Sequence, residues 1–212
     1  MTTLTEKALT LTPHEIITSH DMTVLLAGSS PDRRYGLIKR ALAAGELIHL
    51  RRGLYCPASQ YRRRPLNPYG LAQYLLGPSY ISLETALSYH HWIPEAVYAI
   101  TNVTLTKTAL YETPMGRFAY TRVPQKALLM DVERTEDSGC IYFMARPLKA
   151  LADYVYVHKR DWNGMPPVVE SLRVEEAQMA DVTASEIEEL VENYNSRRIK
   201  RFLIDLKKDL RL

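Results

Sequence analysis

A helix pattern that leads directly into a tight hairpin pattern is the feature that most constrains the fold of this chain. The motif Ser-Pro-Asp at 30–32 begins the helix, because serine caps the first turn and proline suits the first helical position. Gly45 ends it, since glycine readily adopts the backbone conformation that closes a helix. Two short apolar runs follow at 47–50 and 54–56, and Gly53 between them allows a turn. The pattern therefore predicts a helix followed by a two-stranded ribbon.

Two shorter helices are predicted before this unit. The motif Thr-Pro-His-Glu at 12–15 supplies a capping hydroxyl, a proline at the first helical position and a glutamate at the third. We expect this helix to run to Ser19. Asp21 is then expected to cap a second helix over 22–27, which Gly28 ends. Three helices followed by a ribbon is the element order of a winged helix–turn–helix.

The spacing of apolar residues predicts which face of the third helix is buried. At about 100° per residue, Tyr35, Ile38 and Leu42 fall close to one another and are expected to face the core. The opposite side holds Arg33, Gly36, Leu37, Arg40 and Ala44. Long cations beside small residues let a helix sit close to a nucleic-acid groove. This helix is therefore the one predicted to read DNA.

Positive charge is concentrated in the same part of the chain. Residues 28–70 contain nine basic residues against two acidic ones, a net charge of +7 in 43 residues. Residues 71–212 contain 17 basic and 19 acidic residues, so that part carries −2. Such an asymmetry indicates a polyanion contacted by one half only, with a merely solvated basic face as the alternative.

Ten residues are the predicted DNA contacts. Arg33 and Arg40 are expected to reach base edges or phosphates in the major groove, and Leu37 to meet a thymine methyl group. The arginines at the hairpin tip and in the segment after it are expected to hold phosphates. The full set is Arg33, Arg34, Leu37, Lys39, Arg40, Arg51, Arg52, Arg62, Arg63 and Arg64. A winged helix that binds only protein is the alternative interpretation.

A proline-bounded connection at 65–68 is the predicted domain boundary. It separates a winged helix–turn–helix DNA-binding domain at 1–64 from a second domain at 65–212. The second domain is predicted to mix helices and strands and to end in a helical tail, so the fold class is α+β. Its predicted helices cover 69–76, 82–91, 147–158, 168–177, 183–194 and 196–212, and its predicted strands cover 97–101, 103–105, 117–123 and 140–144.

Two stretches of the sequence carry recognisable motifs. The stretch 40–55 reads Arg-Ala-Leu-Ala-Ala-Gly-Glu-Leu-Ile-His-Leu-Arg-Arg-Gly-Leu-Tyr, and 80–90 reads Tyr-Ile-Ser-Leu-Glu-Thr-Ala-Leu-Ser-Tyr-His. They resemble the AbiEi family, whose patterns are L…GEL…lrRGlY and Y-x-S-x-x-S-A-L-x-x-H-G. Thr85 stands in place of the second serine and His91 in place of the glycine. The resemblance extends from residue 12 to residue 160.

The resemblance implies a function for each region. The AbiEi proteins are the antitoxins of type IV toxin–antitoxin systems, related to abortive phage infection, and they repress their own operon. The partner implied for the N-terminal region is therefore double-stranded operator DNA. The family's second domain is linked to neutralising the toxin, which implies a functional pairing with a nucleotidyltransferase-like toxin. The oligomeric state stays open.

The sequence lacks the patterns that the obvious enzyme classes need. Gly28-Ser29 resembles the start of a nucleotidyltransferase site, which needs a carboxylate pair about ten residues later to hold two metal ions. Glu46 is the only acidic residue in the segment 37–48, so the required pair is absent. The chain therefore does not resemble the toxin half of such a system, and we predict that it is not an enzyme.

A nuclease in the second region is the minor alternative. Asp131 and Glu133 place two carboxylates on one face of a candidate strand, but Thr135 stands where a nuclease would have lysine. Asp205 and Lys207 have the Asp-x-Lys spacing, but they lie on a helix without a paired acid in a strand. The histidine pair at 90–91 does not converge on one metal, and Cys56 and Cys140 are expected to be small core residues.

The last predicted helix is amphipathic and basic. Its apolar stripe comprises Ile199, Phe202, Leu203, Leu206 and Leu210. We expect this stripe to pack on the second region; a partner surface or additional DNA contacts are the alternatives.

Composition predicts the compartment. Two cysteines are far too few for a secreted disulfide scaffold, and the first residues lack the pattern of a signal peptide. No apolar run approaches the roughly 18 residues that cross a bilayer. We therefore expect a cytoplasmic protein without membrane contact, metal or cofactor.

Overall fold

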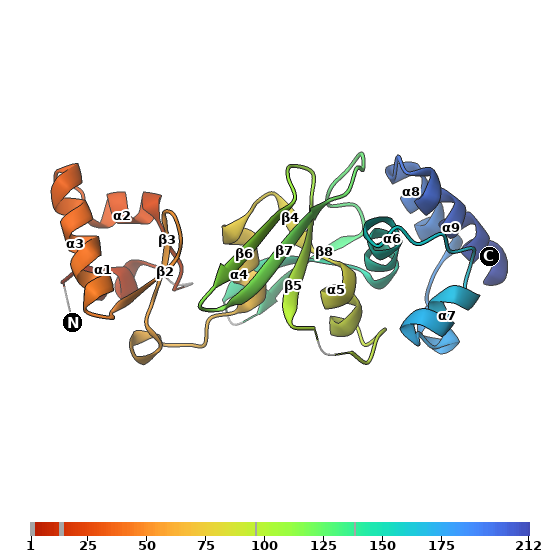
Figure 1. The fold of residues 1–212 in the computed structure, drawn as a ribbon, viewed down its shortest axis with the longest axis horizontal. Helices are drawn as coiled ribbons and strands as arrows, with labels where there is room; N and C mark the ends of the chain where they lie inside the picture. The colour runs from red at the N-terminus through yellow and green to blue at the C-terminus, as the bar shows by residue number, and fades with distance from the viewer. Residues whose placement is uncertain (1–2, 13–14, 96, 138) are drawn as a thin grey trace.

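The protein has an α+β fold with two separate sheets. The computed structural model describes residues 3–12, 15–95, 97–137 and 139–212. A unit of helices and a small sheet lies at one end, a larger sheet lies in the middle, and a group of helices lies at the other end (Figure 1). The first and last helices are therefore far apart along the longest axis.

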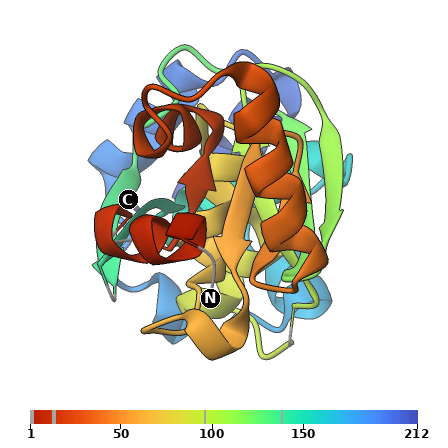
Figure 2. The same ribbon diagram turned by 90° about the vertical axis from the view of Figure 1, so that its left-hand side faces the viewer.

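The N-terminal unit contains three helices and a three-stranded antiparallel sheet of order β1-β3-β2. Figure 2 shows this unit facing the viewer. Its elements are α1 (Thr3–Leu11), β1 (Ile17–Thr18), α2 (Ser19–Leu25), α3 (Pro31–Ala43), β2 (Leu47–Arg51) and β3 (Leu54–Pro57).

The predicted third helix and hairpin are confirmed. Ser30 caps α3, because its hydroxyl oxygen accepts the amide hydrogen of Arg33 across 3.3 Å. Gly45 has a φ of +66° after the helix, and Gly53 has a φ of +74° between β2 and β3. Both positions require the left-handed backbone conformation that glycine tolerates best.

The helix predicted from Thr12 to Ser19 is wrong. Pro13 and His14 lie outside the described residues, and Ile17–Thr18 forms the short strand β1 against β3. Thr18 is the extended residue that caps α2, and Asp21 completes a capping box with it instead of being the cap itself. The extended backbone that this cap requires stops a helix from continuing through Thr18. The helix found in this region, α1, lies upstream and has no counterpart among the predicted elements.

The second region is built on one mixed six-stranded sheet of order β6-β7-β5-β4-β9-β8. The pairs β5–β7 and β4–β9 are parallel, and the other neighbouring pairs are antiparallel. The runs predicted as two strands at 97–101 and 103–105 are replaced by the single strand β5 (Ala99–Thr104), which leaves residues 97, 98 and 105 outside it. The strands are β4 (Ser79–Ile81), β5 (Ala99–Thr104), β6 (Ala109–Thr113), β7 (Gly116–Arg122), β8 (Val132–Asp137) and β9 (Cys140–Ala145).

Helices flank this sheet and extend beyond it (Figure 1). The amphipathic stripe of the last helix is fully buried at Ile199, Phe202, Leu203 and Leu206, in the same hydrophobic cluster as Leu151 of α6. The tail therefore packs on the second region, as expected. The helices are α4 (Pro68–Leu75), α5 (Leu83–Tyr89), α6 (Pro147–Val157), α7 (Pro166–Leu172), α8 (Ala184–Asn193) and α9 (Arg197–Asp209), with short 3-10 turns η1 (Ser59–Tyr61) and η2 (Glu176–Met179).

The two regions each have a hydrophobic cluster of their own, and a third cluster joins them. We call this third set the junction cluster. It brings the hairpin residues Leu50, Leu54 and Cys56 together with α4 and β7, so the proline-bounded segment connects regions that share buried surface. Its members are Ile16, Leu50, Leu54, Cys56, Leu71, Ala72, Leu75, Phe118 and Tyr120.

Candidate nucleic-acid interface

The inner face of α3 determines how the helix is oriented on the N-terminal unit. Ala41 is fully buried, and Leu37, Ile38 and Leu42 pack against the cluster that α1 and α2 supply. The small side chain of Ala41 lets α3 approach its neighbours closely. The opposite face of α3 is therefore directed to solvent.

Two residues of α3 lie on the face opposite to the one predicted. Tyr35, predicted in the core, is 69% exposed, and Leu37, predicted outside, is half-buried in the core cluster. The prediction left Ala41 out of the core-facing stripe, whereas Ala41 is fully buried, so the buried face of the helix is centred nearer to Leu37 than predicted. The stripe runs through Leu37, Ile38, Ala41 and Leu42 at the spacing of one helix face. Leu37 consequently faces the core and not a thymine methyl group.

The outward face of α3 carries cations that pair with no other described residue. Arg33, Lys39 and Arg40 are exposed, as is Arg52 at the hairpin turn. Within the described part of the chain, no ion pair or hydrogen bond engages the charged groups of these four side chains. We call Arg33, Lys39 and Arg40 the α3 cations. They present positive charge directly to solvent, at a spacing that a helix in a groove could use.

Gly36 lies among the α3 cations on the outward face. A Cβ atom built at this position would meet nothing within 4 Å, so packing inside the protein does not require the glycine. The absence of a side chain at Gly36 instead affects the outward surface, because it leaves the helix backbone uncovered between Arg33 and Arg40. A groove wall can approach the backbone more closely there than at a residue with a side chain.

Two predicted contacts on the N-terminal unit are turned inward. Arg34 is half-buried, with an Nε atom that is buried without a hydrogen-bond partner among the described residues. Arg51 donates from Nη2 to the carbonyl oxygen of Tyr74 in α4 across 3.0 Å, and its Nε atom is also buried. Arg51 thus links the hairpin to the second region, while its neighbour Arg52 is directed to solvent.

The three arginines after η1 lie at the junction of the two regions. Arg62 donates from Nε to the carbonyl oxygen of Pro57 across 2.8 Å and from Nη2 to the sulfur of Met115 across 3.7 Å. Arg63 and Arg64 are exposed, and Arg64 has partners within the chain. The structure therefore separates these arginines from the α3 cations instead of placing all of them on one surface.

Glu15 is a residue of this junction that the sequence did not reveal. Its carboxylate accepts the amide hydrogens of Arg63 and Arg64, at 2.6 Å and 3.3 Å, and it is 7% exposed. Its φ of +56° is in the left-handed region, which is uncommon for a residue with a side chain. The sequence pattern places Glu15 in the first turn of the helix predicted at 12–19, and it contains no signal for contacts with residues 48 and 49 positions further along the chain.

A buried polar network occupies the core of the second region. Asp153 of α6 accepts hydrogen bonds from the hydroxyls of Tyr80, Ser82 and Tyr194, at 2.6–2.7 Å. Lys149, one helical turn earlier, donates to Oε1 of Gln125 across 2.7 Å. Burial raises the pKa of Asp153 and lowers the pKa of Lys149. Because both side chains are fully buried, a substrate could not reach them, and the network is structural.

The candidate catalytic groups are engaged in ion pairs or hydrogen bonds. Arg146 contacts the carboxylates of Asp131 and Glu133, at 3.6 Å each, and therefore neutralises the acid pair on which a nuclease would depend. Asp205 pairs with Lys208, and Lys207 with Glu188. His90 donates from Nε2 to the carbonyl oxygen of Ala145 across 2.9 Å. Among the described residues, no three His, Cys, Asp or Glu side chains gather as a metal site would require.

Both cysteines are buried, as expected for small core residues. Burial raises the pKa of Cys56 to about 11, so its thiol is protonated at neutral pH.

Comparison of the chain with protein-family models and with curated proteins gives no match in either case. None of the helices in the described ranges combines the length and the apolarity that crossing a lipid bilayer demands.

Proposed function

We propose that this protein is a DNA-binding transcriptional repressor of its own operon and the antitoxin of a type IV toxin–antitoxin system. In this proposal the N-terminal unit is a winged helix–turn–helix, with α2 and α3 as the two helices and β2–β3 as the wing. The order of elements in this unit supports the proposal, since three helices precede the hairpin. The motifs at 40–55 and 80–90, which resemble the AbiEi family, supply the antitoxin part.

The α3 cations, which pair with no other residue in the described ranges, are the observation that carries the DNA-binding proposal. A cation that has no acidic partner among the described residues is available to a phosphate without first breaking an ion pair. Each phosphate that it neutralises releases condensed counterions from the duplex, which favours binding. Arg33 and Arg40 also have the length and the donor geometry to reach guanine in the major groove.

The wing makes a smaller contribution in this proposal than its sequence indicates. Arg51 is hydrogen-bonded to α4, so Arg52 is the cation of the hairpin turn that faces solvent. One exposed arginine at a turn is suited to a phosphate of the flanking backbone. Sequence discrimination is therefore assigned to α3, and the wing is assigned to positioning.

The second region is assigned to neutralising the toxin by binding instead of by chemistry. Its acidic pair is held by Arg146, and its buried Lys149–Asp153 network is closed to substrate. Its net negative charge makes it a poor ligand for DNA and leaves it available to a protein. The proposed partner is a nucleotidyltransferase-like toxin or the target of that toxin.

A salt titration of duplex binding tests the proposal. The full-length protein would be titrated with a labelled duplex from upstream of its own gene and with a scrambled duplex. The variant Arg33→Ala/Lys39→Ala/Arg40→Ala should bind both duplexes more weakly. The slope of log K against log salt should fall by about 0.9 for each phosphate that the variant no longer neutralises.

The matched control removes the same charge elsewhere. Arg122, Lys126 and Lys159 are exposed cations of the second region, and the triple alanine variant at these positions should retain the affinity of the unmodified protein. Equal losses of duplex affinity in the two triple variants would mean that binding depends on the net charge of the protein and not on α3. That outcome would contradict the proposal. Binding by neither protein would favour a winged helix that contacts only protein, a function compatible with the exposed Tyr35 and Val24.

A further inference from the structure

An open cavity of about 570 Å³ lies where the two regions meet. We call it the junction cavity. Its wall contains the guanidinium-bearing side chains of Arg62, Arg63 and Arg64 and the apolar side chains of Pro65, Leu66 and Met115. The volume is within the range of sites that hold small ligands, roughly 300–1,000 Å³.

The Arg62 side chain and the backbone of the cationic wall are held in place before any ligand arrives. The two bonds of Arg62 to Pro57 and Met115 fix its guanidinium, and the Glu15 carboxylate fixes the backbone at Arg63 and Arg64. A preorganised site loses less conformational entropy on binding than a flexible one. Glu15 also offsets part of the positive charge, which leaves the exposed guanidinium of Arg63 as the group best able to receive an anion.

The apolar wall indicates the second part of a ligand. Leu66 is half-buried, and Met115 carries a polarizable thioether that packs well against flat rings. Guanidinium groups bind phosphate through two parallel hydrogen bonds. A ligand that satisfies both walls carries a phosphate at one end and a flat, weakly polar body at the other.

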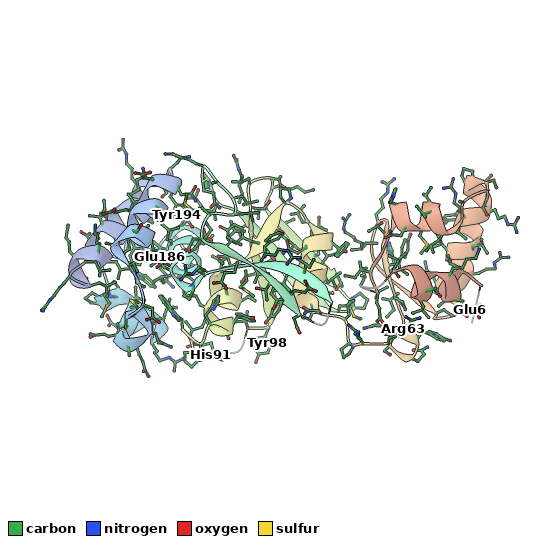
Figure 3. The ribbon with its side chains drawn as sticks, turned by 180° about the vertical axis from the view of Figure 1, so that it is seen from behind. Glu6, Arg63, His91, Tyr98, Glu186 and Tyr194 are labelled. Carbon is green, nitrogen blue, oxygen red and sulfur yellow. The ribbon has the colours of Figure 1, made fainter. Side chains whose placement is uncertain are left out.

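The shape of the site favours a small molecule over duplex DNA. DNA is read by elements that protrude into its grooves, whereas this site is concave. The α3 helix lies at the outer end of the N-terminal unit, while Arg63 lies beside the segment that leads to the sheet (Figures 1 and 3). The junction cavity is thus a second anionic site, separate from the α3 cations.

We propose that the junction cavity binds a nucleoside phosphate. Its phosphate would lie against Arg63 and Arg62, and its base against Leu66 and Met115. Because Met115 precedes β7 and Arg62 follows the hairpin, a ligand in this cavity touches both regions at once. Binding therefore stabilises the arrangement of the two regions and raises the thermal midpoint of the whole chain.

Calorimetric titration and thermal unfolding of the full-length protein test this inference. The probes are ADP and GDP, with adenosine and inorganic phosphate as the two halves of the ligand, all at constant ionic strength. We expect at least one nucleotide to raise the unfolding midpoint and to bind at least 10-fold more tightly than either half. Failure of both nucleotides to bind at millimolar concentration would overturn the inference.

Two variants and a control locate the site. Arg63→Ala should weaken nucleotide binding at least 10-fold, and Ser59→Trp, at an exposed position of the cavity wall, should block it. Arg33→Ala removes the same charge from α3 and should leave nucleotide affinity within twofold. Equal effects of Arg63→Ala and Arg33→Ala on nucleotide binding would overturn the inference.

Duplex binding distinguishes this inference from the proposed function. If Arg63→Ala weakens duplex binding and no nucleotide binds, the arginines are DNA contacts, so the inference fails while the repressor proposal stands. If a nucleotide binds and the duplex does not, the repressor proposal fails while the inference stands.

Discussion

The two regions differ in how far acids of the chain neutralise their positive charges. In the second region many cations are neutralised by acids of the same region: Arg117, Arg134, Arg146, Arg173, Arg198, Arg201, Lys207 and Lys208 all form ion pairs. The α3 cations have no such partners in the described ranges of the chain. Two sets of residues with the same chemistry therefore differ in whether acids of the described chain pair with them, and this is the difference on which the repressor proposal rests.

This difference is more informative than the net charge. An exposed ion pair contributes little to stability, about 0–1 kcal/mol, but it lowers the electrostatic potential that a distant phosphate experiences. The region after residue 70 has nearly equal numbers of basic and acidic residues, so it should neither attract nor strongly repel DNA. Substitutions at the buried charges, at the junction and on α3 test the comparison in turn.

The largest effect is expected for the buried charges of the second region. Asp153→Ala should lower the free energy of unfolding by about 3–5 kcal/mol, because Lys149 would remain buried without its carboxylate and three hydroxyls would lose their acceptor. Urea unfolding followed by circular dichroism measures this change. The double variant Lys149→Met/Asp153→Ala should be less destabilised than the sum of the two single variants. Strict additivity would mean that the two groups are not coupled.

A second prediction tests how far the two regions are separate at all. Leu71→Ala should cost about 2–5 kcal/mol, because Leu71 is fully buried in the junction cluster. Amide hydrogen exchange should show that β3 loses protection together with α4, since Leu54 and Cys56 contact the same cluster. Leu110→Ala, at a position that is 55% exposed, is the control and should change stability by less than about 0.5 kcal/mol. Unchanged protection of β3 in Leu71→Ala would mean that the regions are independent.

The smallest effect is expected on the outer face of α3. Tyr35→Ala should change the free energy of unfolding by less than about 0.5 kcal/mol, because the ring is 69% exposed. Leu37→Ala, two residues along, should cost more than about 1 kcal/mol because its side chain packs in the core. Thermal unfolding of the two variants compares them directly. A larger loss of stability in Tyr35→Ala than in Leu37→Ala would mean that Tyr35 faces the core, as the sequence pattern predicts, and would contradict the structure.

Local signals predicted the elements that local chemistry controls. Ser30, Pro31 and Gly45 bound α3, and Gly53 permits the hairpin turn, because caps and turns depend on neighbouring residues. The strand β1 was missed, since its two residues become a strand only by pairing with Leu54 and Tyr55, which are far along the chain. A strand this short carries no periodicity of its own.

The candidate site was predictable in composition but not in orientation. The α3 cations could be identified from charge, whereas the positions of Tyr35 and Leu37 depended on which neighbours pack against Ala41. The roles of Arg51 and Arg62 depended on the carbonyl oxygens of Tyr74 and Pro57, which no sequence pattern identifies as acceptors. The charge of a side chain can be read from the sequence, whereas the direction in which the side chain points depends on how the folded elements pack.

The junction cluster has a consequence for how this protein can evolve. The hairpin lies between α3 and the larger sheet, and its apolar residues fit α4 and β7 of this particular chain (Figure 1). A recombination event that transplanted the N-terminal unit onto another protein would expose Leu50 and Leu54, and the fusion would be prone to aggregate. The α3 surface carries no such constraint. In the proposed function, preference for a new DNA target can therefore drift by single substitutions on α3, while inheritance of the two regions remains linked.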